Sequence, residues 1–210
     1  MLSGDGFINF GDIADKERTD AFSLSGWVYR EATAAGSYSL ITKYPGASSK
    51  GYFVQLVSSV PEFFMRGTGG ILHVSAATSL SLRQWEHWVM TYSGNSLASG
   101  VKFYINAELV SNNTPTSDTL AGTVLGGGAD LMVGIKADAS DYMVGRQTKT
   151  IIHDAELTQD EVTALYRDDN SLHTEYSWLW REGSGSTLAP WVGGVTGAIT
   201  NPVWSTNVPR

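Results

Sequence analysis

Short stretches of alternating apolar and polar residues recur along the whole chain, with turn-forming residues between them. In residues 21–29, Phe22 and Leu24 alternate with Ser23 and Ser25, a period of two that is typical of a half-buried β-strand. Similar strand-like segments are residues 7–10, 38–44, 52–57, 62–66, 71–75, 86–92, 101–105 and 129–135. Glycine-rich or serine-rich turns lie between several of them, at 67–70, 93–96 and 126–128. About ten short strands with little helix predict an all-β protein, a two-sheet antiparallel sandwich of the jelly-roll kind.

One short helix is predicted near residues 158–167. Thr158 and Glu161 have the spacing of a capping box, in which each side chain binds a backbone N–H of the other's turn. Leu157 and Val162 occupy the hydrophobic positions on either side of this cap. Val162, Leu165 and Tyr166 share one helix face, so we expect that face to pack on the sheet.

The last forty residues differ in composition from the rest. Residues 176–180 are rich in aromatic side chains, residues 181–186 read as a turn, and Trp191 and Trp204 follow among glycine and proline. We therefore divide the chain into a jelly roll at 1–170 and a C-terminal segment at 171–210. This segment either forms strands that pack on the same domain or is an arm that reaches a neighbouring subunit.

Composition and charge exclude several classes of protein. The chain has 210 residues, which suits one domain with at most a short appendage. It has no cysteine, which excludes disulfide scaffolds and thiolate chemistry. The net charge of −7, without a run of Lys and Arg, predicts neither a nucleic-acid partner nor binding to an anionic membrane surface. The first residues lack the basic and apolar regions of a signal peptide, so we expect synthesis in the cytosol without secretion.

The order of these segments resembles the concanavalin A-like, laminin-G-type jelly rolls that are widespread in bacterial and phage proteins. The likeness rests on residues 4–11, 21–28, 85–92 with 101–106, 131–134, 141–145 and 151–158, and it ends with Glu161, Val162, Leu165 and Tyr166. These positions are mostly core and turn residues, so the resemblance implies a fold rather than an activity. Residues 179–204 resemble a strand that usually precedes such a domain. In the family, an Asp-Ser-Gly-Asn stretch there is often a source of calcium ligands. In this chain, residues 188–194 replace that stretch.

No catalytic residue is predicted. Glycosidases on this scaffold need paired carboxylates about 5–5.5 Å apart for a retaining mechanism. Asp154 and Glu156 come nearest to such a pair, but they directly precede the predicted helix, where acidic residues favour the helix dipole. The four histidines, His73, His87, His153 and His173, have no metal-binding spacing, and His87 fits a packed core position. We expect the protein not to be an enzyme.

Two kinds of binding site are possible from the residue types. Calcium binds carboxylate and carbonyl oxygens, and Asp5, Asp12 and Asp141 lie in loops that suit it, although acidic turns also serve solubility alone. Aromatic rings near loops can stack on sugars, and the candidates are Tyr38, Tyr44, Tyr52 and Trp191. The alternative for each ring is core packing.

Two functions remain open at this point. The first is a non-catalytic structural protein of a tailed-phage virion, either a capsid-decoration or a tail-associated protein, with itself and other virion proteins as partners. The absent cysteine, the absent signal peptide and the aromatic C-terminal segment favour this role and a location in the virion. The alternative is a glycan-binding, lectin-like module, with or without calcium, whose partners are host-surface glycans.

Overall fold

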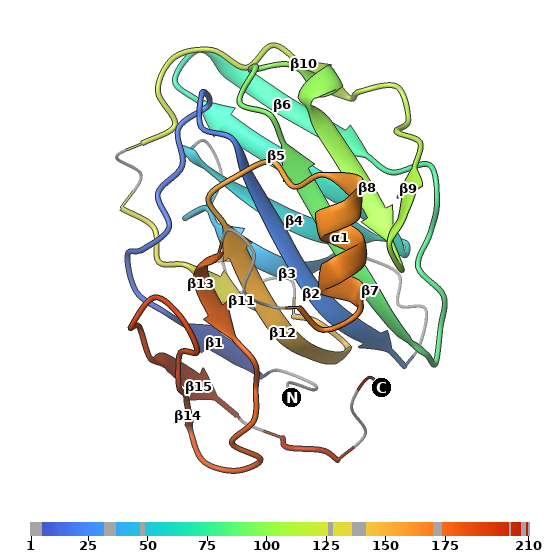
Figure 1. Cartoon of the computed structure of the whole chain (residues 1–210). Helices are drawn as coiled ribbons and strands as arrows, with labels where there is room; N and C mark the ends of the chain where they lie inside the picture. The colour runs from blue at the N-terminus through green and yellow to red at the C-terminus, as the bar shows by residue number, and fades with distance from the viewer. Residues whose placement is uncertain are drawn as a thin grey trace.

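The computed structural model describes residues 6–31, 37–46, 49–125, 128–135, 142–169, 174–201, 203–206 and 209. They form two antiparallel sheets that face each other (Figure 1). The nine-stranded sheet runs in the order β10 (Ser117–Asp118), β6 (Gly70–Ser75), β5 (Val60–Gly67), β4 (Gly51–Val57), β3 (Ser37–Lys43), β11 (Met132–Val133), β1 (Phe7–Asn9), β15 (Gly197–Thr200) and β14 (Thr187–Leu188). The six-stranded sheet runs in the order β13 (Thr174–Trp178), β12 (Gly145–His153), β2 (Phe22–Arg30), β7 (Trp85–Tyr92), β8 (Val101–Ile105) and β9 (Glu108–Val110). The predicted all-β, two-sheet antiparallel sandwich is confirmed.

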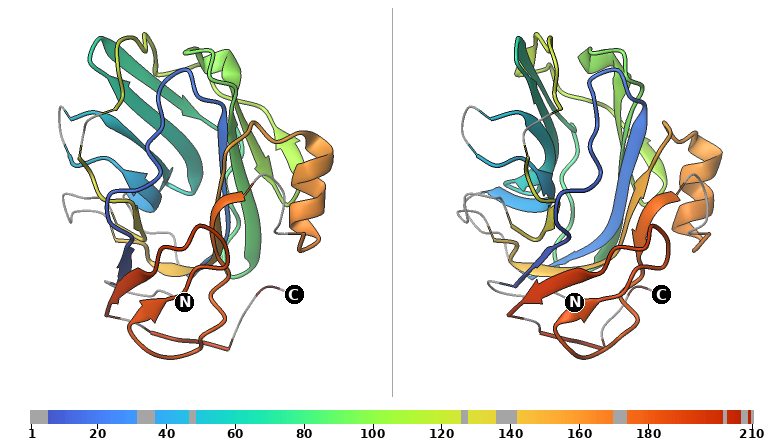
Figure 2. Two further views of the ribbon diagram at one scale, coloured as in Figure 1. Left: turned by 60° about the vertical axis from the view of Figure 1, so that its left-hand side comes forward. Right: turned by 90° about the vertical axis from the view of Figure 1, so that its left-hand side faces the viewer.

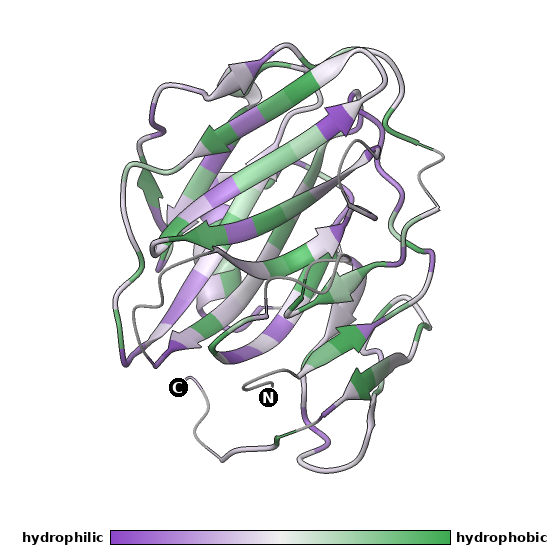
Figure 3. Cartoon of the chain, turned by 180° about the vertical axis from the view of Figure 1, so that it is seen from behind, coloured by the Kyte–Doolittle hydropathy of each residue, from purple (hydrophilic) through white to green (hydrophobic). Residues whose placement is uncertain are grey.

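The core lies between the two sheets and is rich in aromatic rings. Phe22 on β2 meets Tyr52 on β4 and Phe63 on β5 with ring centroids 5.3 and 6.1 Å apart, and it meets Tyr92 on β7 at 5.7 Å. All four side chains are buried. Tilted and edge-on contacts of this kind add to the stability gained from burying the rings. Along the strands of the nine-stranded sheet, hydrophilic and hydrophobic residues follow one another in short alternation (Figure 3).

Strand β2 departs from the half-buried pattern predicted for it, because both of its faces are covered. Ser23 and Ser25 are as buried as Phe22 and Leu24. The hydroxyl of Ser23 donates to the carbonyl of Ala155 at 2.7 Å and accepts from the backbone N–H of Leu157 at 3.1 Å. The hydroxyl of Ser25 lies 3.1 Å from Nε2 of His153. The segment before the helix therefore covers this outer face, and the serines satisfy its backbone groups.

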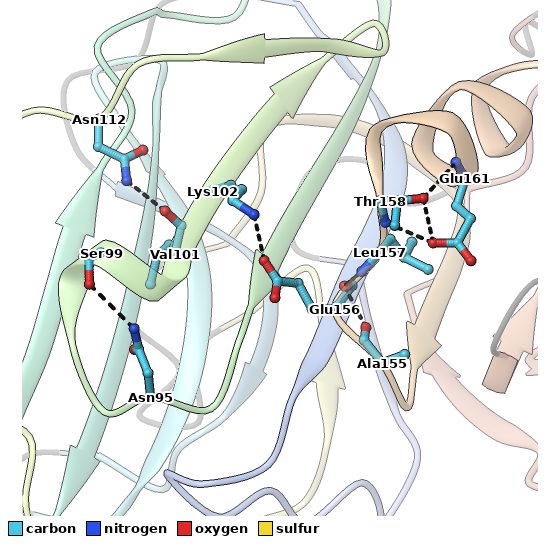
Figure 4. Close-up of polar contacts among 11 residues, drawn as sticks. Asn95, Ser99, Val101, Lys102, Asn112, Ala155, Glu156, Leu157, Thr158 and Glu161 are labelled. Carbon is cyan, nitrogen blue, oxygen red and sulfur yellow. Dashed lines mark hydrogen bonds and ion pairs between the residues drawn. The ribbon is translucent and has the colours of Figure 1, made fainter.

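The predicted helix is confirmed as α1 (Gln159–Tyr166), which packs on the outer face of the six-stranded sheet (Figure 2). Thr158 is the N-cap residue and forms the capping box with Glu161 (Figure 4). Leu157, Val162 and Leu165 are buried in a small cluster against the sheet. A short 3-10 helix, η1 (Ala98–Gly100), precedes β8. Among the described residues no helix is long and apolar enough to cross a membrane.

The described part of the C-terminal segment packs on its own chain. Strand β13 pairs with β12 in one sheet, while β15 pairs with β1 in the other, so that Ile199 lies opposite Ile8. Trp178 is fully buried, with its ring centroid 3.9 Å from that of Phe10, and its indole N–H donates to the carbonyl of Val195 at 2.8 Å. The boundary predicted at residue 170 falls outside the described residues.

Candidate functional site

Two adjoining hollows, which we call the C-terminal groove, lie where strand β13 leaves the six-stranded sheet. Their volumes are about 330 and 400 Å³. Leu179, Trp180 and Arg181 line both hollows. The first hollow is completed by Glu182, Ala189, Pro190 and Trp191, and the second by Thr148, Lys149, Asp168, Gly183, Trp204, Ser205 and Pro209. Hollows of this size with aromatic walls and a few polar groups are typical of small-ligand sites.

Trp191 is the most exposed aromatic side chain of this groove, and it is held in place. Its side chain is 60% exposed. The guanidinium of Arg181 lies over its indole ring, 4.9 Å from the centroid. Its backbone N–H donates to the carbonyl of Ser177 at 2.8 Å. After it, Gly193 has φ +91°, and a side chain there would collide with the ring of Tyr176, so only glycine fits this turn.

Three non-glycine residues of the groove have a left-handed backbone. The φ angles are +51° for Lys149, +80° for Asp168 and +57° for Trp180. Lys149 takes this conformation where strand β12 shifts register against β2 between Thr148 and Ile151. Each such residue costs about 1–3 kcal/mol and persists only where its surroundings hold it, which is frequent at ligand sites. The Nζ of Lys149 lies 2.7 Å from Oδ1 of Asp168, so an ion pair ties strand β12 to the end of α1.

Two of the predicted sugar-stacking tyrosines lie in the core. Tyr52 is 1% exposed, and its hydroxyl donates to the carbonyl of Ala14 at 2.6 Å. Burial raises the pKa of this hydroxyl well above its ordinary value. Tyr38 is also buried, as part of the main hydrophobic cluster. Since neither ring presents a face to solvent, we do not retain Tyr38 or Tyr52 as glycan contacts.

Tyr44 lies on the outer face of the nine-stranded sheet, and it is not among the residues that line the C-terminal groove. Its ring packs edge-on against Phe53 and Phe64, at 5.5 and 5.4 Å between centroids. Those two phenylalanines stack on each other at 4.7 Å. The predicted aromatic residues are therefore not brought together into one site, and Trp191 is the most exposed of the four candidates.

The same sheet face carries a polar cluster that sequence reasoning missed. The Oε2 atom of Glu62 lies 2.9 Å from Nε2 of His73 and accepts from the amide of Gln55 at 3.2 Å. Arg66 lies over the ring of Phe64, 6.0 Å from its centroid. The alternation within residues 62–66 places Glu62, Phe64 and Arg66 on one face, but only the register of β5 against β4 and β6 shows which partners they meet.

Of the acidic pair next to the helix, Glu156 is engaged in a structural ion pair. The Oε1 atom of Glu156 accepts from Nζ of Lys102 at 2.6 Å (Figure 4). Asp154 is exposed. The hydrogen bond to Glu156 raises the pKa of Lys102. His87 is packed as predicted, between the rings of Trp27 and Tyr166 at 5.2 and 5.8 Å. Burial lowers the pKa of His87 from 6.5 to about 3, so this ring is neutral.

Of the three predicted calcium ligands, only Asp12 belongs to the described residues; Asp5 and Asp141 lie outside them. The Oδ1 atom of Asp12 accepts from Nζ of Lys43 at 2.7 Å, and Asp15 lies 3.1 Å from the same nitrogen. Lys43 also donates to the carbonyl of Ala129 at 2.8 Å. An ammonium group therefore stands where these oxygens converge. Within the described ranges, no group of three or more His, Cys, Asp or Glu side chains is arranged to hold a metal ion.

Comparisons with solved structures show the same fold at low sequence identity. A candidate carbohydrate-binding protein from Bacteroides ovatus has a TM-score of 0.65 and 11% identity over 93% of this chain, which spans 56% of that protein. The heptameric SAP-like pentraxin from Limulus polyphemus has a TM-score of 0.54 and 11% identity, covering 94% of this chain and 96% of its own. The CBM40 module of the Ruminococcus gnavus IT-sialidase, solved with α2,3-sialyllactose, has a TM-score of 0.53 and 12% identity, covering 70% and 83%.

A comparison with curated protein sequences gives no match. The family model of the concanavalin A-like lectin/glucanases superfamily matches residues 2–163. This range contains most of both sheets and reaches into helix α1. The chain therefore belongs to the concanavalin A-like lectin/glucanases superfamily.

Proposed function

We propose that this chain is a non-catalytic glycan-binding module and that Trp191 in the C-terminal groove is its stacking platform. The observation that carries the proposal is the exposed indole of Trp191, fixed beside a hollow of about 330 Å³. A sugar ring has an apolar C–H face, and an indole offers a flat apolar surface of matching size. The similar folds of a candidate carbohydrate-binding protein and of the CBM40 module support the same class of function.

The energetic argument rests on exposure and rigidity together. Leaving a large apolar side chain in water forgoes about 1.5–3 kcal/mol that burial would supply. Trp191 is nevertheless anchored on both sides, by the Arg181 guanidinium over its ring and by its backbone hydrogen bond to Ser177. A ring that is already held in one position loses little conformational entropy when a ligand stacks on it. The side chain of Trp191 is therefore preorganised for ligand binding.

The test is a glycan array followed by isothermal titration of the best glycan. We expect wild type to bind, and Trp191→Ala to lose at least about fivefold in affinity, because stacking on one aromatic residue is worth about 1–3 kcal/mol. Leu109→Ala on strand β9 is the matched control, since Leu109 is equally exposed but far from the groove lining. An array without hits, or equal affinities for wild type and Trp191→Ala, would overturn the proposal.

A further inference from the structure

The charged side chains of the C-terminal groove differ in whether they already have a partner. Lys149 is paired with Asp168 at 2.7 Å. Glu182 uses its Oε1 atom to accept the backbone N–H of Ala189 at 2.7 Å. Arg181 is different, because within the described part of the chain no carboxylate is paired with its guanidinium. Its guanidinium instead contacts the ring of Trp191.

The position of Arg181 places its positive charge next to the ring of Trp191. Arg181 lines both hollows, and its guanidinium lies over the ring of Trp191, which lines the first of them. A cation–π contact of this kind engages the charge of the guanidinium and does not use up its N–H donors. These donors form a planar fork that matches the two oxygens of a carboxylate. A ligand that stacks on the remaining surface of Trp191 therefore meets beside it a cation that, among the described residues, is paired with no carboxylate.

We infer that the groove selects a carboxylated saccharide, with Arg181 binding the sugar carboxylate while Trp191 stacks on the ring. This inference rests on the proposed function and narrows it to one ligand class. The chain carries a net charge of −7, so its overall field does not attract anions. Selection for an acidic sugar must then come from direct contact with Arg181. Uronic and sialic acids share the required chemistry, namely a carboxylate attached to a sugar ring.

The experiment compares each acidic oligosaccharide with its carboxyl-reduced form by isothermal titration. One pair is an oligouronate and its reduced analogue, and the other is sialyllactose and its reduced analogue. We expect wild type to prefer the acidic member of at least one pair by about tenfold or more, since hydrogen bonds to charged groups contribute about 1.5–3 kcal/mol. The pair that shows the preference identifies the source of the carboxylate.

Arg181→Gln should abolish that preference by weakening only the acidic ligand, and Arg181→Lys should retain part of it because a point charge remains. Arg167→Gln is the matched control, as it removes the same charge from an exposed position outside the groove. If Arg181→Gln weakens the acidic and the reduced ligands equally, Arg181 only supports Trp191, and this inference fails while the proposed function stands. If neither ligand of either pair binds wild type while the glycan array gives hits with other sugars, this inference fails and the proposed function stands.

Discussion

The ammonium nitrogen of Lys43 lies 2.7 Å from Oδ1 of Asp12 and thereby ties the loop after strand β1 to the end of strand β3. Asp15 and the carbonyl of Ala129 complete the oxygen atoms around this nitrogen. The Lys43 side chain is 6% exposed, whereas the two carboxylates are 56% and 61% exposed. The ammonium group of Lys43 is therefore buried, whereas the carboxylates of Asp12 and Asp15 that surround it remain exposed to solvent.

Lys43→Gln should lower the free energy of unfolding by about 1–2 kcal/mol. A fully buried pair would lose about 3–5 kcal/mol when one partner is removed, but here the carboxylates regain water and the loss is smaller. Urea unfolding of the two proteins measures the difference. Asp12→Asn is the control and should cost less, because Lys43 keeps Asp15 and Ala129 as partners. Equal stabilities of wild type and Lys43→Gln would contradict this prediction.

The same variant has a second readout. Without the ammonium, two carboxylates and a carbonyl oxygen remain close together, and oxygen atoms of this kind are the ligands of calcium. Calcium should then raise the melting temperature of Lys43→Gln, because the lysine no longer competes for the oxygens. The melting temperature of wild type should stay unchanged, because its ammonium group still occupies them. If the melting temperature of Lys43→Gln is the same with and without calcium, these oxygens separate once the lysine is removed.

His87 should make the fold less stable in acid. Its pKa in the folded protein is about 3, below the ordinary value of 6.5, because its ring is buried. The unfolded chain therefore binds more protons between these two values, and stability falls as the pH falls through this range. Replacing His87 by Leu removes this contribution, so the loss of unfolding free energy from pH 7 to about pH 4.5 should be smaller by roughly 2–3 kcal/mol.

Urea unfolding of wild type and His87→Leu at both pH values measures that difference. Other groups titrate in the same range, but they contribute to both proteins and cancel in the comparison. Parallel losses of stability in the two proteins would mean that His87 becomes protonated without unfolding.

Ser59→Gly should stabilise the hairpin between strands β4 and β5. Ser58 and Ser59 connect these strands with φ angles of +48° and +86°, which is the left-handed conformation at both turn positions. Turns of this kind favour glycine, since a side chain is strained there. Relief of that strain, less the greater freedom of glycine in the unfolded chain, gives about 0.5 kcal/mol. The midpoint of chemical unfolding should rise, whereas Ser75→Gly at the end of strand β6 should lower it.

Local features of the fold were predictable because the responsible residues are neighbours in the sequence. The capping box needs only Thr158 and Glu161, and it appears as expected. The alternation of Phe22 and Leu24 correctly indicated which side of β2 faces the core. The burial of Ser23 was not predictable from β2 alone, because its cover comes from Ala155 and Leu157, more than a hundred residues away.

The candidate site was predictable only in part, for the same reason. Trp191 stood out as an aromatic residue near a loop, but the same criterion also selected Tyr52, which the sheet turns inward. Arg181 gave no signal of its own, since its role depends on the ring that lies beneath it. The polar cluster of Glu62 and His73 depends on the register between β5 and β6. That register cannot be predicted from composition and periodicity.

The virion role stays a separate prediction, because the similar proteins described above include no virion component. It predicts stable homo-oligomers or co-purification with phage particles. A strictly monomeric protein without affinity for any particle would count against it. Glycan binding and a virion location are compatible, so the two tests are independent of each other.

The pairing of β1 with β15 determines how the molecule responds to mechanical force. The strands are antiparallel, and Phe7 at the start of β1 lies opposite Thr200 at the end of β15. A pull on the chain before residue 7 and after residue 200 therefore acts at the same end of this strand pair. The hydrogen bonds between the two strands are loaded one after another, as in opening a zipper, rather than all together in shear. Tension between the two ends should separate β15 from β1 at low force, before the rest of the sandwich yields.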